Sequence, residues 1–448
     1  MIEAVRRNEP VSADFFTLLR QSDRLLLADG GGLWYNITNY GRGKQSSMRK
    51  SGLNLSGIKE NNRALILQMI CTAGQITRSE LAARSRLSQM TVTNIVNELL
   101  GKKLIEELQP GEHAKLPGRT PMVLRVCAHA PVILGVFISR CWIYGAIGDF
   151  SMHLLDREEV ALGEVESEQT VLEKLRWLVQ TLIARCERTI CGIGVATVGA
   201  VNPENGSIAY ITSFYGIEKL SVADFLRGHF PYPVYVANDM QAAGLCELYF
   251  GVGREEDDFL YVGITNGVGA ALISNRELFE SHGEMGHMSI NCNGPQCTCG
   301  NNGCLELYVS TPRILQRIRE DCGVQLSTMQ QAVALAMEDR TAYTTLYNAL
   351  RRLGYGINNY LNLINVPTVV LGHDAFFLTD ELIASMQAHI ESTGIAVHLM
   401  DRELRILRST FEDIAPLYGS LCVFLQRIFR GDYPIDELLS IGQEGAAV

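Results

Sequence analysis

The chain has no long hydrophobic run, although 47% of its 448 residues are hydrophobic. A helix that crosses a bilayer needs about 20 consecutive apolar residues, so the sequence argues against a membrane protein. It also opens without a charged and then apolar leader that ends in small residues. We therefore expect a cytoplasmic protein, with room for two or three domains.

Positive charge is scarce in most of the chain and is concentrated at one end. Residues 1–128 hold 18 Lys and Arg against 11 Asp and Glu, a formal charge of +7, whereas the remainder holds 21 against 38, a charge of −17. DNA phosphates would attract the basic part and repel the acidic part. This asymmetry predicts an N-terminal DNA-binding domain and a larger body held away from the duplex.

The first 55 residues show no sustained hydrophobic period, and the run Gly41–Ser51 is polar and basic. This composition predicts a poorly ordered tail. The apolar residues Phe15–Leu19 and Leu25–Leu27 leave a short helix or hairpin open as an alternative. Met48 stands just before the first recognisable domain, so an upstream extension of the gene is a second explanation for the tail.

Three short helices are predicted after the tail. Apolar residues from Asn61 onward recur at helical spacing as far as Gly74, and Thr77-Arg78-Ser79-Glu80 is typical of a capping box that starts a second helix. Ser88 is expected to cap the third helix, Gln89–Leu100. The residues predicted to face the core from this third helix are Val92, Ile95, Val96 and Leu99.

The polar face of the third helix is expected to lie in the major groove of DNA, where Gln and Asn amides pair with adenine edges. The strands Leu104–Leu108 and Met122–Val126 predict a wing, with Arg119 between them on a stiff backbone suited to the minor groove. An alternative is a winged helix used only for protein contacts. The predicted DNA contacts are Ser88, Gln89, Thr91, Thr93, Asn94, Asn97, Lys102, Lys103 and Arg119.

From Cys127 the pattern changes to alternating strands and helices, which indicates an α/β fold. Thr189–Val195 is almost entirely apolar, as expected of a strand buried on both faces. Val234–Ala237 delivers Asn238 and Asp239 to a strand end, where α/β folds place ligand groups. The other predicted strands are Val132–Gly135, Trp142–Ile147, Phe259–Ile264, Gly269–Ile273 and Thr368–Leu371, and the predicted helical segments are Glu166–Arg185, Met240–Phe250, Thr311–Asn362, Thr379–Ser392 and Ile414–Phe429.

One histidine and four cysteines gather in the Gly-, Asn- and Pro-rich stretch Gly283–Glu306. Imidazole and thiolates are the ligands of a tetrahedral structural zinc ion, whereas unrelated reduced cysteines are the alternative. Cys292 has no paired ligand nearby and is left out. Twelve cysteines with such a cluster suit a reducing compartment better than a disulfide framework. The predicted zinc ligands are His287, Cys297, Cys299 and Cys304.

The same stretch resembles the signature of the ROK family, which contains bacterial sugar kinases and sugar-responsive transcriptional repressors. The resemblance rests on Glu284-Met285-Gly286-His287 and on Cys297–Glu306, and it extends from about Pro131 to the C-terminal region. It implies an α/β fold in which a winged helix-turn-helix precedes a two-lobed actin-like ATPase body with a zinc knot. The expected domains are 56–128, then lobes at 129–236 and 237–448, with the C-terminal helix free to return to the first lobe.

The resemblance also implies a sugar site. The family's Asn-Asp pair corresponds to Asn238, which would position a hydroxyl, and Asp239, which would take its proton; a helix cap without ligand role is the alternative for Asp239. One nitrogen of His287 would face zinc and the other a sugar hydroxyl. Ser213–Gly216 departs from the family's Asn-Pro-Gly. The implied sugar-contacting residues are Gly199, Asn238, Asp239, Glu284, His287 and Glu306.

The phosphate-binding loops depart further from the family pattern. The first loop, Asp-x-Gly-Gly-Thr in the family, corresponds to Phe137-Ile138-Ser139-Arg140-Cys141, without the acid or the glycines. The second keeps part of its pattern in Thr265–Ala270, and the third reads Gly372-His373-Asp374. Because phosphoryl transfer depends on such loops and a metal, we expect no catalytic residues, no ATP binding and no kinase activity.

The resemblance and the basic N-terminal domain together predict a transcriptional regulator, most simply a repressor of carbohydrate-related genes controlled by a sugar or sugar derivative. Recognition of one half-site is weak, so a homodimer or tetramer is expected on the DNA operator. A sugar-transport protein is a further candidate partner. Two alternatives stay open: a sugar kinase with an appended DNA-binding domain, and a regulator whose body serves only as a dimerisation scaffold.

Overall fold

The computed structural model describes residues 55–109, 122–165, 167–202, 205–209, 214–280, 283–398 and 403–439. They belong to one unit, Asn54–Val448. Within these ranges, no helix has both the length and the apolar character that a bilayer crossing requires. The predicted tail before Leu55, the tip of the wing with Arg119, and Ser213 lie outside the described residues.

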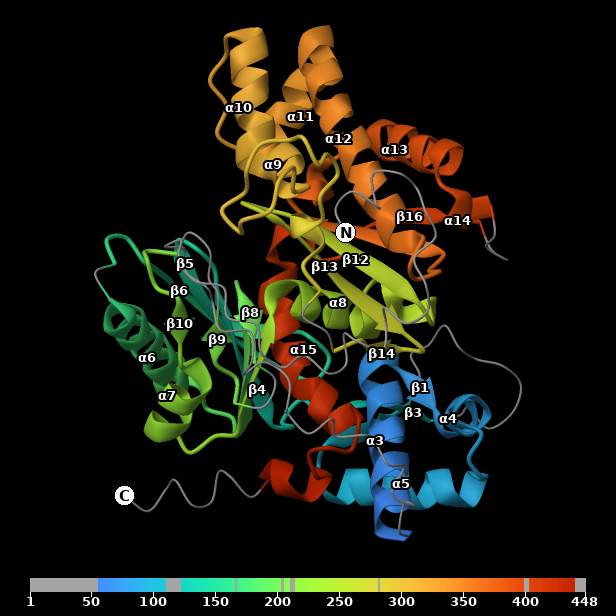
Figure 1. Ribbon diagram of the computed structural model, residues 1–448. Coiled ribbons are helices and arrows are strands. Elements are labelled where there is room, and N and C mark those ends of the chain that lie inside the picture. Colours follow the sequence, from blue (N-terminus) through green and yellow to red (C-terminus); the bar gives the residue numbers. More distant parts are fainter. Residues whose placement is uncertain are drawn as a thin grey trace, which may run out of the picture. The chain divides into compact units, whose positions relative to one another are not determined.

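A winged helix-turn-helix forms the first part of the described chain (Figure 1). Its wing strands pair antiparallel in the order β1-β3-β2, so a short strand before the second helix joins the predicted pair. The capping box at Thr77 is confirmed, and Gly74 follows the first helix with φ +71°. The elements are α3 (Leu55–Ala73), β1 (Ile76–Thr77), α4 (Arg78–Ser85), α5 (Gln89–Gly101), β2 (Ile105–Leu108) and β3 (Val123–Val126).

A five-stranded sheet with the order β11-β7-β4-β5-β6 follows. All residues of β7 are buried, as its apolar sequence predicts. The helix α6 (Glu168–Arg185) covers one face, where Leu178 packs against Gly145. The strands are β4 (Val132–Ile138), β5 (Trp142–Gly148), β6 (Leu154–Ala161), β7 (Ile190–Thr197) and β11 (Val234–Asn238). A small sheet and one helix beside it were not predicted: β8 (Ala200–Val201), β9 (Ile208–Ala209), β10 (Lys219–Leu220) and α7 (Val222–His229).

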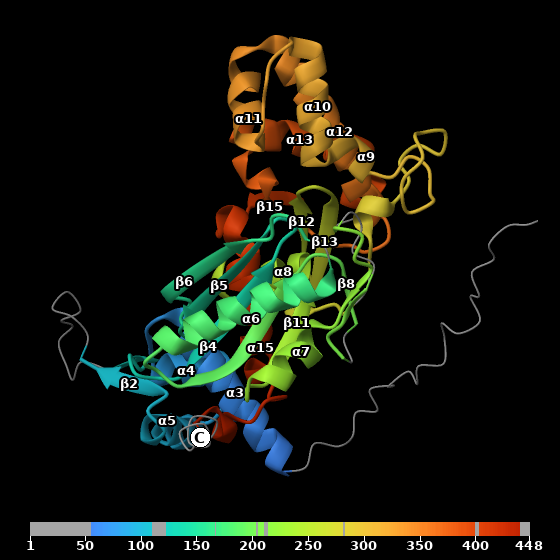
Figure 2. The ribbon, with the colours of Figure 1, turned by 90° about the vertical axis from the view of Figure 1, so that its left-hand side faces the viewer.

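A second five-stranded sheet has the order β14-β13-β12-β15-β16. Its helices α10 to α13 gather at the end of the molecule opposite the winged helix in both views (Figures 1 and 2). The strands are β12 (Phe259–Ile264), β13 (Val268–Ser274), β14 (Glu277–Leu278), β15 (Thr368–His373) and β16 (Arg405–Arg408). The helices are α9 (Glu306–Val309), α10 (Thr311–Cys322), α11 (Met329–Glu338), α12 (Arg340–Leu361), α13 (Asp380–Thr393) and α14 (Ile395–His398).

Two helices, α8 (Asp239–Phe250) and α15 (Ala415–Phe429), lie between the two five-stranded sheets (Figure 1). The backbones approach closely where Gly419 meets Ala242. Glycine permits this approach, since any side chain at position 419 would clash with the backbone of Ala242. The rings of Tyr249 and Phe429 meet edge to face further along, so the two helices run in the same general direction. The C-terminal helix α15 also packs on the first sheet, against Gly194 of β7.

One hydrophobic core connects these two helices with the winged helix. A single cluster of buried side chains includes Leu67 of α3, Leu99 of α5, Leu245 of α8 and Leu421 of α15. The second sheet and its helices form a separate cluster around Leu260. The winged helix is therefore packed onto the body rather than tethered to it.

Candidate functional site

The four predicted metal ligands converge. One ligand atom from each of His287, Cys297, Cys299 and Cys304 lies within 4.8 Å of the others. The Sγ of Cys297 is 3.6 Å from Nδ1 of His287, and the Sγ atoms of Cys299 and Cys304 are 3.6 Å apart. Sulfur ligands around a tetrahedral zinc lie about 3.8 Å from one another at normal bond lengths. The residues therefore fit a tetrahedral metal ion, and Cys292 is exposed outside this cluster.

Backbone contacts fold the loop around the cluster. The amide of Cys297 donates to the carbonyl of Asn301 (2.7 Å), and that of Gly303 donates to Pro295 (2.8 Å). Gly303 has φ +63°, and a side chain there would clash with a backbone carbonyl. On its other side the loop rests on β13, where Gly286 meets the carbonyl of Val268. The metal cluster is thus fixed to the second sheet.

The predicted Asn-Asp pair lies where β11 ends and α8 begins. Oδ1 of Asn238 accepts from the amide of Met240 (2.9 Å), and Nδ2 donates to the carbonyl of Gly199 (3.0 Å). Asn238 is therefore the helix cap, and the alternative that gave this role to Asp239 is wrong. Gly199 has φ +91°, a conformation that favours glycine. The cap holds three of the predicted sugar-contacting residues in one group.

Asp239 is buried at the first position of α8. Burial raises the pKa of its carboxyl to about 7, while the amide of Met240 and the positive charge of Arg140 act in the opposite direction. Arg140 belongs to the segment that the sequence resemblance assigns to the first phosphate loop. That segment therefore presents a cation toward Asp239 in place of a metal-binding acid.

Glu306 connects the metal cluster with the second loop. Its Oε1 is 3.2 Å from Sγ of Cys297 and 3.5 Å from Nδ1 of His287. A Cβ on Gly267 would lie 3.2 Å from Oε2, so this carboxylate closely approaches the Thr265–Ala270 segment. Nδ1 is thus the nitrogen of His287 that faces the cysteines. Glu284 is exposed just before His287.

The third helix of the winged domain has the expected buried and polar faces. Its four predicted core residues are all buried. Oγ of Ser88 accepts from the amide of Thr91 (3.1 Å) and caps α5. Gln89 and Asn94 are exposed, whereas Thr93 is half-buried. The start of the helix therefore presents amide groups to solvent.

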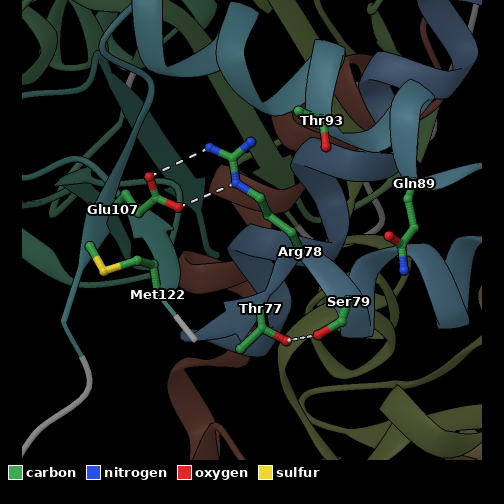
Figure 3. A pocket seen from close by; sticks show the side chains of 7 residues that line it. All are labelled: Thr77, Arg78, Ser79, Gln89, Thr93, Glu107 and Met122. Atoms are coloured by element: carbon green, nitrogen blue, oxygen red, sulfur yellow. Dashed lines mark hydrogen bonds and ion pairs between the residues drawn. The ribbon is translucent and has the colours of Figure 1, made fainter. Parts of the chain in front are cut away.

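A hollow of about 370 Å³ lies between α4, the start of α5 and the wing, and Figure 3 shows the side chains that line it. Arg78, which sequence reasoning missed, points across it: Nε lies 3.2 Å from a carboxylate oxygen of Glu107, and Nη1 donates to Oδ1 of Asn97 (3.1 Å). Its position after the capping Thr77, in the basic part of the chain, was the available signal. The lining residues are Thr77, Arg78, Ser79, Gln89, Thr93, Glu107 and Met122.

The two predicted lysines after α5 differ. Nζ of Lys102 is 2.5 Å from Oδ1 of Asp436, which lies near the C-terminus in a 3-10 turn, η7 (Ile435–Leu439). Lys103 is exposed and has φ +57°. Lys102 is thus held by the body, and Lys103 faces solvent.

Comparison with known proteins places this geometry in a family. Residues 134–427, more than half of the chain, match the sequence model of the ROK family. The chain belongs to the ROK family. Residues 60–112 match the model of the MarR family, which agrees with the winged helix. The predicted fold class is therefore confirmed.

The ROK chain is similar to proteins named as repressors. It is 27% identical to a putative xylose repressor of Caldicellulosiruptor sp. (strain Rt8B.4), over 82% of this chain and 96% of the relative. It is also 27% identical to the DNA-binding transcriptional repressor Mlc of Escherichia coli (strain K12), over 82% and 93%. The alignments run nearly the full length of both relatives.

Solved structures agree on the fold. A ROK family transcriptional regulator, described as a homolog of the E. coli MLC protein, aligns with TM-score 0.71 and 24% identity over 87% of this chain and all of its own. A ROK hexokinase from Thermus thermophilus aligns with TM-score 0.56 and 20% identity over 66% of this chain and 98% of its own. The regulator thus covers more of this chain than the kinase does.

The segment predicted to correspond to the third phosphate loop, Gly372-His373-Asp374, contains a buried histidine. His373 is buried with φ +54°, and its Nδ1 lies 3.1 Å from the hydroxyl of Tyr261. Burial lowers the pKa of His373 to about 4, so the imidazole is neutral near pH 7. The following Asp374 accepts a hydrogen bond from Thr311 (2.5 Å). A neutral ring and an acid thus stand where the ROK kinase pattern has phosphate-binding glycines.

Replacing Asp239 by asparagine is expected to stabilise this ROK protein above pH 7. The folded state binds a proton at Asp239 up to about pH 7, whereas an aspartate in the unfolded chain releases its proton near pH 3.9, so the native carboxyl costs stability as pH rises through that window. We expect Asp239→Asn to add about 1–3 kcal/mol at pH 8 and little at pH 4.

Thermal unfolding of both proteins at the two pH values checks this. The matched control is Asp224→Asn, since Asp224 is an exposed acid in the first turn of α7. It should show no pH-dependent gain. An equal effect of Asp239→Asn at both pH values would contradict the prediction.

Proposed function

We propose that this chain is a sugar-responsive transcriptional repressor. Its winged helix-turn-helix binds operator DNA, and its ROK body binds a sugar or sugar derivative that weakens this binding. The observation that carries the proposal is a winged helix with an exposed polar helix α5, packed onto a ROK body whose first loop carries Arg140 in place of a metal-binding acid. Similarity to a putative xylose repressor and to Mlc, over 82% of this chain and nearly the full length of each relative, supports it.

The DNA-binding surface we propose combines α5, the wing and the hollow beside Arg78. Gln89, Asn94 and Asn97 supply amides for base edges, and Lys103 supplies a charge for a phosphate. Ser88 and Thr91 hold the start of the helix. Arg119 stays a predicted minor-groove contact. The domains that we propose are the winged helix-turn-helix at 56–128 and the two lobes of the body at 129–236 and 237–448.

The effector site we propose lies at the start of α8 and beside the metal loop. Asn238, Asp239 and Gly199 contribute one side, while Glu284, His287 and Glu306 contribute the other. The buried carboxyl of Asp239, with a pKa near 7, accepts or donates a hydrogen bond to a sugar hydroxyl at physiological pH. Because phosphoryl transfer needs a metal and phosphate loops, the same carboxyl binds ligand here without catalysis.

The metal we propose is zinc, because three thiolates and one imidazole in tetrahedral reach are its usual structural ligands. When bound, it supplies a rigid cross-link between distant parts of the loop. His287 and Glu306 are then held in fixed orientations beside the Thr265–Ala270 segment.

The protein acts as a cytoplasmic homodimer or tetramer in this proposal. One winged helix reads a half-site weakly, and two of them bind when their spacing matches the helical repeat of DNA. The effector binds the arrangement that does not match the operator more tightly, and so shifts the population away from DNA. A sugar-transport protein is the alternative source of this signal.

Selection of binding sequences from a random duplex library with the zinc-loaded full chain tests the proposal. We expect enrichment of a palindromic site, and we expect one member of a panel of pentoses, hexoses, amino sugars and their phosphates to reduce binding. No enriched sequence would overturn the DNA-binding part. A flat response to every sugar would favour the scaffold alternative, and ATP-dependent phosphorylation of a sugar would favour the kinase.

A further inference from the structure

We infer that the carboxylate of Asp436 competes with DNA for Lys102, and that α15, which leads into the turn η7 with this carboxylate, places the competition under control of the ROK body. The inference rests on the proposed function, because it concerns how DNA binding is regulated. It depends on a contact between two segments that are far apart in the sequence.

The contact is a dense cluster of charges. Asp436 binds the guanidinium of Arg63 through two oxygens, at 2.9 and 3.1 Å, and its Oδ1 lies 2.5 Å from Nζ of Lys102. The amide of Ile435 donates to Oε1 of Glu60 (2.9 Å). Two such parallel bonds from one arginine fix the direction of the carboxylate. The turn η7 is therefore anchored to both α3 and the end of α5.

Arg63 does not depend on Asp436 for its charge balance. Its side chain is only 4% exposed, and it also pairs with Glu60 (2.7 Å) and with Glu98. Both of these carboxylates belong to the winged helix itself. Losing Asp436 therefore leaves Arg63 with partners, and the cost of an orphaned buried charge does not arise. The winged helix therefore does not need the Asp436 contact in order to fold. This contact instead joins the winged helix to the body.

The charge of Lys102 depends more on Asp436 than the charge of Arg63 does. The side chain of Lys102 is 25% exposed, and Asp436 is the acid that its ammonium contacts in the described part of the chain. The bonds from Arg63 and Lys102 hold the pKa of Asp436 well below its usual range, so its negative charge persists at physiological pH. A phosphate and this carboxylate would bind the same ammonium. While Asp436 holds Lys102, the end of α5 lacks that positive charge toward DNA.

The body reaches this contact through α8 and α15. Near the proposed effector site, Ala242 of α8 touches Gly419 of α15 backbone to backbone. Both helices end at the winged helix: after α8, Nη1 of Arg254 donates to the carbonyl of Thr72 (3.3 Å), and α15 leads into the turn with Asp436. Figure 1 shows α15 running from the body to α3. A shift of this helix pair would move Asp436 relative to Lys102.

Binding of a mixed-sequence DNA duplex to the full chain, followed by fluorescence anisotropy between about 50 and 200 mM salt, tests the inference. We expect Asp436→Asn to bind about three- to tenfold more tightly, since one repelling charge is lost and one lysine is freed. The salt dependence should steepen by about 0.9 in log–log slope for each protomer that contacts DNA. The matched control is Asp432→Asn, since Asp432 faces Arg427 and Arg430 instead.

A second variant separates competition from a structural effect. Adding Lys102→Gln to Asp436→Asn should return the salt slope to that of the wild type, because the freed ammonium is gone. Weaker binding by Asp436→Asn, or a slope equal to that of Asp432→Asn, would overturn the inference. If the wild-type chain binds no duplex at all, the proposed function fails instead.

Discussion

Cys304→Ser is expected to abolish metal binding and to destabilise the loop Gly283–Glu306. Cys304 is fully buried, and its sulfur lies among the other three ligands. The loop is held by turns and glycines rather than by a core of its own, so metal binding supplies much of its folding free energy. Structural zinc sites contribute about 10–16 kcal/mol in small domains; here a loss of several kcal/mol is expected.

Metal content by mass spectrometry and thermal unfolding measure this outcome. We expect about one zinc ion per chain in the wild type and none in Cys304→Ser, with a lower melting temperature. The matched control is Cys292→Ser, which removes an exposed thiol from the same loop. It should retain the metal and the wild-type stability. Full metal content in Cys304→Ser would contradict the assignment of the ligands.

The double substitution Gln89→Ala and Asn94→Ala is expected to remove specific operator binding. Both amides are exposed on α5, and neither contributes to the buried face of that helix. Each amide that pairs with a base contributes about 1–3 kcal/mol of discrimination. The loss for the pair is therefore at least about 30-fold in affinity for the selected site, with little change in melting temperature.

Anisotropy with the selected duplex and with a scrambled duplex measures this loss. Binding to the scrambled duplex should persist, because phosphate contacts do not depend on these amides. The control is Gln169→Ala, which removes an exposed amide from α6 of the body. Unchanged specificity in the double variant would show that another element reads the bases.

Local patterns predicted most of the fold. The capping box at Thr77, the cap at Ser88 and the apolar strand β7 each depend on residues adjacent in sequence. The strands β6 and β16 were missed because they are edge strands with charged residues. In β6 the side chains of Asp156-Arg157-Glu158-Glu159 alternate between half-buried and exposed positions. In the sequence, this charged run is more typical of a solvated loop than of a strand.

In the candidate site, too, the sequence predicted contacts between residues that lie close together in the chain, and it did not predict contacts between distant segments. The metal ligands were found because all four lie within one loop. The pairing of Arg78 with Glu107, of Lys102 with Asp436 and of Asp239 with Arg140 joins distant segments. No local pattern couples such partners, since only the packing of the helices and sheets brings them together. Sequence reasoning therefore named Lys102 and Asp239 as functional without their partners, and it named neither Arg78 nor Glu107.

Because one hydrophobic core joins Leu67 and Leu99 to Leu245 and Leu421, the DNA-binding domain and the body are not independent modules. A DNA-binding domain on a flexible tether can be exchanged between proteins without changing either part. Here the exchange would expose half of a shared apolar surface on each side. A chimera that gives this body a new operator preference must therefore keep the buried residues of α3 and α5 that belong to this core, and change only the side of α5 that faces solvent.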